Sequence, residues 1–177
     1  NNNSLEQLEV NIELLEPFKL KMNNAEIEIG GKIILNGSLA APTPKGTLSL
    51  KKGYFIYFDK KFSVLDGLVA INGINPEDIE LNARANTQVQ GVQIKINVLG
   101  KLLHPQILLS SQPSLKETEI LSLLAFDRNI QGRSEGEISQ LLSQEMVNII
   151  FQSLQMNLFR RIEREIAEGL GLEFLKI

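Results

Sequence analysis

The sequence predicts a mainly β protein followed by C-terminal helices, and the spacing of its apolar residues is the main reason. Apolar and polar residues alternate almost without interruption between Asn72 and Gln112. Successive side chains of a strand project to opposite faces, so each alternating run makes a ribbon with one apolar and one polar face. After Pro113 the apolar spacing changes to three or four residues, which is typical of helices. We therefore expect an amphipathic sheet over residues 1–112, a helical segment over 113–168 and a terminal strand over 169–177.

Turn signals divide the N-terminal part into about eight to ten short strands, spaced about 8–12 residues apart. Asn23-Asn24 and Gly30-Gly31 predict turns, and Pro17 ends the first alternating run. Asn36-Gly37 predicts a two-residue hairpin, because both positions tolerate positive φ. The Pro-Thr-Pro segment at 42–44 predicts a loop. This pattern is typical of an antiparallel sheet, a sandwich or a barrel.

Two capping boxes predict where the helices begin. Ser-Leu-Lys-Glu opens a helix over 114–128, and Ser-Glu-Gly-Glu opens a long helix over 134–168, which Gly169 can close. An apolar stripe needs a surface to pack on. We therefore expect the long helix to cover apolar sheet surface, of its own chain or of a second copy. The stripe consists of Ile138, Leu141, Leu142, Met146, Ile149, Ile150, Leu154, Leu158, Ile162 and Ile166.

Composition excludes several functional classes. The chain has 177 residues, which suits one domain or a domain with an appendage, and its net charge of −3 argues against nucleic acid as the main partner. The absence of cysteine excludes disulfides, thiolate nucleophiles and cysteine-ligated metals. No stretch approaches the ~18 continuous apolar residues of a membrane span. Because the chain opens on Asn1 without a signal peptide, we expect a soluble fragment of a longer protein.

Catalytic residues are hard to find in this sequence. His104 is the only histidine, and we interpret it as a solvated or loop-packing residue. Glu77, Asp78 and Glu80 could form the carboxylate pair of a glycosidase, but a charged turn followed by a polar strand face explains them better. A carbohydrate-active enzyme therefore ranks last. We predict no enzyme, no metal and no cofactor other than bound lipid or detergent.

The apolar strand faces allow two interpretations from the residues alone. They could form the closed core of a sandwich, or they could line a groove that remains accessible. Apolar residues are 43% of the chain and aromatic residues only 6%, so this surface is mostly Ile, Leu and Val. Such a surface is chemically uniform and lacks the shape-specific anchors of an aromatic pocket.

An ordered series of glycines and strand endings resembles a known family. The series begins with Gly-Thr-Leu-Ser-Leu at 46–50 and ends with Glu-Ile-Leu-Ser-Leu-Leu at 119–124, after Ser-Ser-Gln-Pro at 110–113. In this order it resembles the conserved C-terminal domain of TamB, over residues 40–124. The chain departs from the family pattern at 126–128, where Phe-Asp-Arg stands in place of a usual Gly-Arg pair. The intervening segments of the series are residues 53–55, 62–71, 75–83, 92–100 and 105–109.

The resemblance implies a curved, open antiparallel sheet, or β-taco, with a hydrophobic groove along it. It also implies a non-enzymatic periplasmic fragment of an inner-membrane-anchored protein of a diderm bacterium. Such a module would carry phospholipid acyl chains between the inner and outer membranes and contribute to outer-membrane biogenesis. The residues expected to line the groove are Ile27, Ile29, Leu48, Leu50, Val69, Ile71, Ile79, Leu81, Val92, Ile94, Ile96, Val98, Ile107 and Leu109.

The partners that the resemblance implies are phospholipid and an Omp85-type outer-membrane barrel protein, TamA-like or BamA-like. The alternative function is a chaperone or assembly module that engages nascent outer-membrane β-barrel proteins. We also expect a homo-oligomer, formed through the apolar stripe of the long helix.

Overall fold

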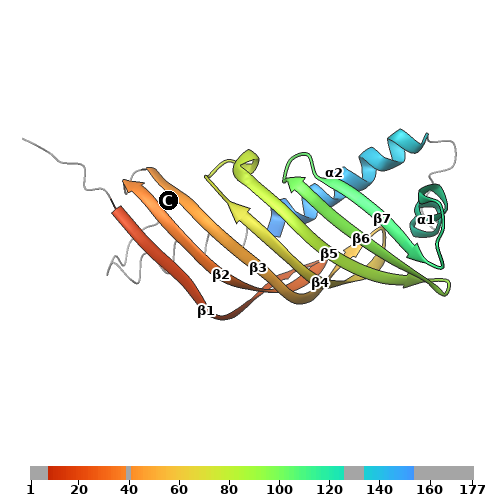
Figure 1. The fold of residues 1–177 in the computed structure, drawn as a ribbon, viewed down its shortest axis with the longest axis horizontal. Coiled ribbons are helices and arrows are strands. Elements are labelled where there is room, and N and C mark those ends of the chain that lie inside the picture. Colours follow the sequence, from red (N-terminus) through yellow and green to blue (C-terminus); the bar gives the residue numbers. More distant parts are fainter. Residues whose placement is uncertain (1–7, 39–40, 126–133, 154–177) are drawn as a thin grey trace, which may run out of the picture.

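The computed structural model describes residues 8–38, 41–125 and 134–153 (Figure 1). Seven antiparallel strands form one sheet in sequential order, so each strand pairs with the strand that precedes it in the chain. Two helices follow, α1 (Glu117–Leu124) and α2 (Glu135–Ser153). The strands are β1 (Leu8–Met22), β2 (Ala25–Ser38), β3 (Ala41–Tyr57), β4 (Lys60–Ile71), β5 (Ile79–Val89), β6 (Val92–Lys101) and β7 (Gln106–Gln112), with a 3-10 turn η1 (Pro76–Asp78) before β5.

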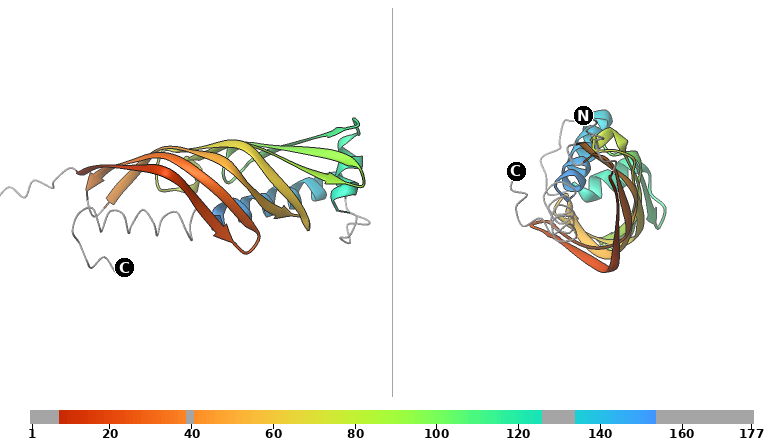
Figure 2. Two further views of the ribbon diagram at one scale, coloured as in Figure 1. Left: turned by 90° about the horizontal axis from the view of Figure 1, so that it is seen from below. Right: turned by 90° about the vertical axis from the view of Figure 1, so that its left-hand side faces the viewer.

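This architecture confirms the predicted fold class. The sheet is open, because β1 and β7 are its two edges and do not pair with each other. Figure 2 shows that the sheet twists along its length, as expected for the right-handed twist of long strands. Helix α2 runs across one face of the sheet. Helix α1 follows β7 closely and lies at the end of the sheet.

The prediction of eight to ten short strands was wrong, since seven long strands run through most of the expected breaks. Strand β1 continues past Pro17 by a register shift between Leu14 and Phe18. Asn36-Gly37 lies inside β2 and pairs with Pro42 and Thr43 of β3, so it is not the hairpin turn. The turn at Asn23-Asn24 was predicted correctly.

The Pro-Thr-Pro segment lies in a strand rather than in the predicted loop. Pro42 and Pro44 pair with β2, whereas β4 begins to pair with β3 only at Gly46. Proline has no N–H group and is tolerated where a strand lacks a neighbour on one side. The register therefore explains why these prolines do not end β3.

One face of the sheet forms the core of the molecule. Along β5 the residues alternate between buried Ile79 and Leu81 and exposed Glu80 and Asn82, as the sequence pattern predicts. The buried residues of β1 to β6 join a single cluster, against which the half-buried Ile107 and Leu109 of β7 pack. The cluster also contains Ile120, Leu121 and Leu124 of α1 and Met146 of α2. The sheet and both helices thus share one apolar interior.

Helix α1 begins later than its predicted capping box. Its N-cap is Lys116, whose backbone N–H donates to Oε2 of Glu119 at 2.8 Å. The Ser111 hydroxyl accepts a hydrogen bond from the Leu115 N–H at 3.0 Å, which holds the chain in a turn ahead of the helix. The predicted box at Ser114 and Glu117 was therefore wrong. The predicted end of this helix lies among residues 126–133, outside the described residues.

The capping box of α2 was predicted correctly. The Ser134 N–H donates to Oε2 of Glu137 at 2.7 Å, and the Glu137 N–H donates to the Ser134 hydroxyl at 3.4 Å. Ile138, Leu141 and Met146 pack on the core cluster, so the described part of α2 covers apolar sheet surface as expected. The predicted continuation to residue 168 and the terminal strand over 169–177 lie outside the described residues.

Candidate functional site

The residues predicted to line a groove all lie on the apolar face of the sheet and belong to one cluster. Paired residues of neighbouring antiparallel strands point to the same side. The register places most of these residues opposite one another, other apolar residues or glycines, whereas Ile94 lies opposite Thr87 and Ser111. The fully buried members are Ile29, Leu48, Val69, Ile71, Ile79, Leu81, Ile94, Ile96 and Val98. The half-buried members are Ile27, Leu50, Val92, Ile107 and Leu109.

Two rows of paired residues cross all seven strands, and we call them the apolar rows. Every position in them is an apolar residue or a glycine, so a path perpendicular to the strands meets no polar side chain. The first row is Phe18, Ile29, Leu50, Gly67, Ala83, Val98 and Ile107. The second row is Leu20, Ile27, Gly53, Val64, Ala85, Ile96 and Leu109.

The middle of both rows is built from small residues. Gly67 leaves room for the Leu50 side chain of the neighbouring strand, because a Cβ at Gly67 would meet Leu50 and Ala83. Leu50 and Ala83 are themselves only half-buried. The centre of the face is therefore shallow, and part of its hydrocarbon surface is exposed.

An open groove along this face is not seen in the structure. Ile94 and Ile96 are 0% and 1% exposed, and Leu48 is 1% exposed. These side chains are enclosed by their neighbours, so the described chain fills most of the predicted groove itself. The half-buried side chains of β2, β3, β6 and β7 provide the accessible part of the surface.

An aromatic cluster at the β3–β4 hairpin was missed by the sequence reasoning. Phe55 and Phe62 stack with ring centroids 5.4 Å apart, and Tyr57 meets Phe62 edge-on at 5.8 Å. Tyr57 is 0% exposed. Burial, and then the negative charge of Glu145 in α2, raise the pKa of the Tyr57 hydroxyl far above its usual range, so the hydroxyl stays neutral. The aromatic residues on both sides of the turn at Phe58 were the signal in the sequence that could have revealed this cluster.

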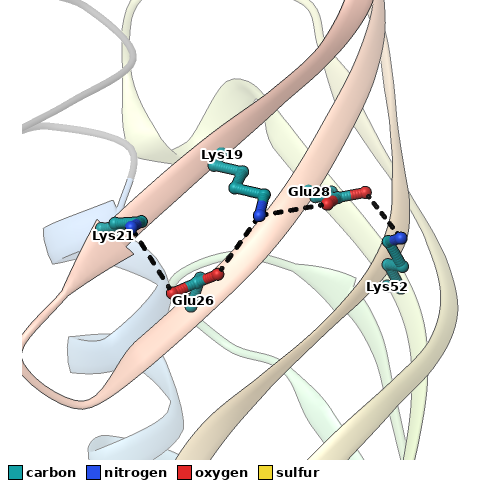
Figure 3. Close-up of polar contacts among 5 residues, drawn as sticks. All are labelled: Lys19, Lys21, Glu26, Glu28 and Lys52. Atoms are coloured by element: carbon teal, nitrogen blue, oxygen red, sulfur yellow. Dashed lines mark ion pairs between the residues drawn. The ribbon is translucent and has the colours of Figure 1, made fainter.

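The opposite face of the sheet is polar and carries cross-strand ion pairs. Figure 3 shows a chain of them over β1, β2 and β3. The Lys19 ammonium lies 3.8 Å from Glu26 and 3.7 Å from Glu28, and Lys52 lies 3.6 Å from Glu28. Lys21 extends the chain at the Glu26 end. Such exposed pairs contribute little stability, but they mark this face as the one in contact with water.

A second set of charges lies over β4 and β5 on the same polar face. Arg84 binds Asp66 through two of its nitrogens, and its Nε lies 2.8 Å from Oδ1 of Asp66. The hydrogen bond from this guanidinium lowers the pKa of the Asp66 carboxyl, so the pair stays charged at neutral pH. Both residues are exposed, and we interpret this bidentate pair as a structural contact between β4 and β5.

Two of the carboxylates considered for catalysis make structural contacts. Glu80 pairs with Lys101 at 3.0 Å, and Asp78 caps η1 by accepting a 3.3 Å hydrogen bond from the Asn75 N–H. His104 is exposed in the turn between β6 and β7. Among the described residues, no group of three or more His, Asp or Glu side chains is placed to hold a metal ion.

Comparison with protein families shows the family to which this chain belongs. The model of the TamB C-terminal domain matches residues 2–177, the whole chain. The chain belongs to the TamB C-terminal domain family. No curated protein sequence matches it significantly.

Membership confirms the resemblance noted in the sequence. TamB-family proteins are anchored in the inner membrane, span the periplasm of diderm bacteria, and are associated with the Omp85-type partner TamA. This TamB domain is accordingly a module of outer-membrane assembly, in a family of non-catalytic transport and assembly modules. In the part of the chain that the structure describes, neither helix has the length and apolar character to cross a membrane.

Proposed function

We propose that this TamB domain carries phospholipid acyl chains on the apolar face of its sheet, between the inner and outer membranes. The apolar rows are the observation that supports this proposal. They extend from β1 to β7 without a polar side chain, so an acyl chain that contacts their accessible part meets only hydrocarbon. The half-buried Leu50, Ile107 and Leu109 provide hydrocarbon surface that a guest can contact.

The energetics of acyl transfer favour a uniform aliphatic surface. Burying a methylene is worth about 0.8 kcal/mol, so a 16-carbon chain gains about 13 kcal/mol relative to water. Relative to a bilayer the difference is close to zero, because both surroundings are hydrocarbon. A conduit needs this level profile, whereas a pocket that retains its ligand needs a deep minimum. Charged headgroups would remain in water outside the sheet.

The first prediction compares two neighbouring leucines on opposite faces of β7. Leu109 is half-buried on the apolar face, and Leu108 is 44% exposed on the polar face. We expect Leu109→Asp to remove co-purified phospholipid and Leu108→Asp to retain it, because only Leu109 lies in the apolar rows. Native mass spectrometry with lipid extraction measures loading, and circular dichroism checks that both variants fold.

Leu109 is a better test position than Ile94 or Ile96. These two isoleucines are almost fully buried, and a charge there would unfold the domain whether or not lipid binds. Equal phospholipid content in the folded Leu109→Asp and Leu108→Asp variants would contradict the proposal.

Strand addition is the second candidate function, and the difference between the two edges of the sheet supports it. The β1 edge carries Pro17 and five charged residues, features that protect an edge from pairing. The β7 edge, Gln-Ile-Leu-Leu-Ser-Ser-Gln, has neither charge nor proline. An extended strand of a nascent outer-membrane protein, or of the Omp85-type partner, could add to β7 through backbone hydrogen bonds.

The second prediction tests this edge with lysine substitutions. We expect Leu108→Lys with Ser110→Lys to weaken binding of an extended outer-membrane peptide, since charged side chains discourage strand pairing. Asn11→Lys on the β1 edge is the control. Fluorescence anisotropy of a labelled peptide measures affinity, and peptide-dependent hydrogen-exchange protection of β7 amides locates the contact. No binding at micromolar peptide, or protection at β1 only, would count against strand addition.

A second copy of the chain as partner stays a prediction. Light scattering of the full chain, coupled to size exclusion, measures its oligomeric state directly.

A further inference from the structure

The two helices are anchored on the apolar face to different extents. Helix α1 has eight residues and fully buries Ile120, Leu121 and Leu124. Helix α2 has 19 residues. Among the α2 side chains that the structure describes, Met146 is the fully buried one, at 3% exposed. Helix α1 is thus a fixed part of the core, whereas the described part of α2 is held by less buried surface for its length.

Other apolar side chains of α2 keep part of their surface in water. Ile138 and Leu141 pack against the core cluster but are only half-buried, and Val147 beside Met146 is half-buried as well. A partly exposed side chain gains only part of the free energy of full burial. Regions with few buried apolar contacts open locally at a low cost in free energy. The described part of α2 therefore leaves the face more easily than α1 does.

Glu145 shows which part of the sheet α2 covers. Burial raises the pKa of the Tyr57 hydroxyl, and the nearby negative charge of Glu145 raises it further. Helix α2 therefore passes close to the aromatic cluster of the β3–β4 hairpin. Figure 2 shows that the helix runs across the same face of the sheet. Met146 follows Glu145 in the helix and belongs to the core cluster of that face.

The contacts that α2 makes with this face are of the kind that an acyl chain makes. Both apolar rows consist of apolar residues and glycines, and Met146 offers a flexible thioether side chain that adapts to irregular surfaces. Such contacts depend on hydrocarbon area rather than on shape or direction. An acyl chain that replaces α2 on the face would therefore restore the same kind of burial.

We infer that α2 is a displaceable lid on the apolar face, and that α2 and a bound acyl chain compete for the same surface. The inference rests on the proposed function for the identity of the competitor. The docked helix contributes to the closed face seen in the structure, and its departure exposes the hydrocarbon beneath it. The lid keeps this surface out of water until an acyl chain replaces the helix.

A lid changes lipid affinity with a sign that a structural helix does not produce. The apparent dissociation constant of a ligand equals its intrinsic value divided by the fraction of protein in the competent state. A substitution that weakens docking of α2 increases the open fraction, so it tightens lipid binding. Loosening a helix that merely supports the sheet would leave the affinity unchanged or weaken it.

The third prediction compares two substitutions in α2 of the full chain. We expect Met146→Ala to tighten binding of dihexanoyl phosphatidylcholine about tenfold, because the lid loses its buried side chain. Gln144→Ala at an exposed position of the same helix is the control and is expected to leave affinity unchanged. Methionine and glutamine have similar helix propensities, so the two variants differ mainly in buried surface. Isothermal titration calorimetry measures affinity.

Hydrogen exchange checks that Met146→Ala loosens α2 rather than the whole domain. The amides of α2 are expected to exchange faster in this variant, while those of β5 and β6 keep their protection. Equal acceleration in the sheet would show that Met146 is a general core residue and would overturn the lid.

Spin labels measure the movement of α2 directly. The chain has no cysteine, so Lys95→Cys on β6 and Asn148→Cys on α2 take labels at two exposed positions only. We expect dihexanoyl phosphatidylcholine to lengthen the distance between these labels, measured by double electron–electron resonance. The distance between labels at Lys95→Cys and Lys45→Cys, both on exposed sheet positions, is expected to stay constant.

The outcomes separate the lid from the transport function. If the lipid binds while the distance from Lys95 to Asn148 stays constant, acyl carriage stands and the lid is wrong. Equal or weaker lipid binding by Met146→Ala than by Gln144→Ala would also overturn the lid. Lipid binding by Met146→Ala but not by the unmodified chain would support both, with α2 docked almost all the time. No lipid binding by any variant would remove both the lid and the transport function.

Discussion

Phe62→Ala is expected to lower the free energy of unfolding by about 3–5 kcal/mol, the usual cost of removing a buried phenylalanine. Phe62 is 0% exposed and contacts both Phe55 and Tyr57. Its removal leaves a cavity between rings that hold the β3–β4 hairpin against the core, and rigid neighbours fill such a cavity poorly. Urea unfolding followed by circular dichroism measures the change, in the fourth prediction.

Leu65→Ala on the same strand is the matched control for Phe62→Ala. Leu65 is 46% exposed, and substitutions at such surface positions usually change stability by less than about 0.5 kcal/mol. Similar losses in the two variants would show that the aromatic cluster has no special part in the core.

Gly53→Ala is expected to cost roughly 2–6 kcal/mol, which combines backbone strain with overpacking. Gly53 has φ +145°, and a Cβ there would collide with the Glu26 carbonyl oxygen and the Ile27 Cα. Both obstacles are backbone atoms of β2, which cannot move without breaking the ladder. Gly53 also belongs to the second apolar row, so this close approach shapes the candidate site. Thermal and urea unfolding measure the loss, in the fifth prediction.

Gly91→Ala separates the two contributions to this loss. Gly91 has φ +81°, but a Cβ there would meet no atom within 4 Å. We expect it to cost only about 1–2 kcal/mol, the penalty of the left-handed conformation alone. If Gly53→Ala were no more costly than Gly91→Ala, the close approach of β2 and β3 would not constrain the sheet.

The apolar face of the sheet could be located from the sequence, but the accessibility of its residues could not. Alternation placed Ile94 and Ile96 on the apolar face correctly, because the period of two in a strand is a local property of the backbone. The same pattern predicted no difference between these residues and Leu109. The structure buries the isoleucines and leaves Leu109 half-buried, since exposure depends on which distant segments pack above each side chain.

The hairpin signals show the same limit in the fold. Asn23-Asn24 turns the chain as predicted, whereas Asn36-Gly37 lies within a strand. Both residue pairs allow a turn, but Asn36 and Gly37 pair with residues of β3, and this pairing extends β2 beyond them. Pro42 and Pro44 are tolerated in β3 for the related reason that no β4 residue pairs beside them.

The sequence by itself determined the class of fold, the polarity of each sheet face, the capping box of α2 and the family. These follow from periodicity and from short motifs, whose physical causes act over a few residues. Only the tertiary structure decided the strand lengths, the buried aromatic cluster and the docking of α2 on the sheet of its own chain. These depend on register and packing between segments far apart in the chain, and no local pattern encodes which segment packs above a given side chain.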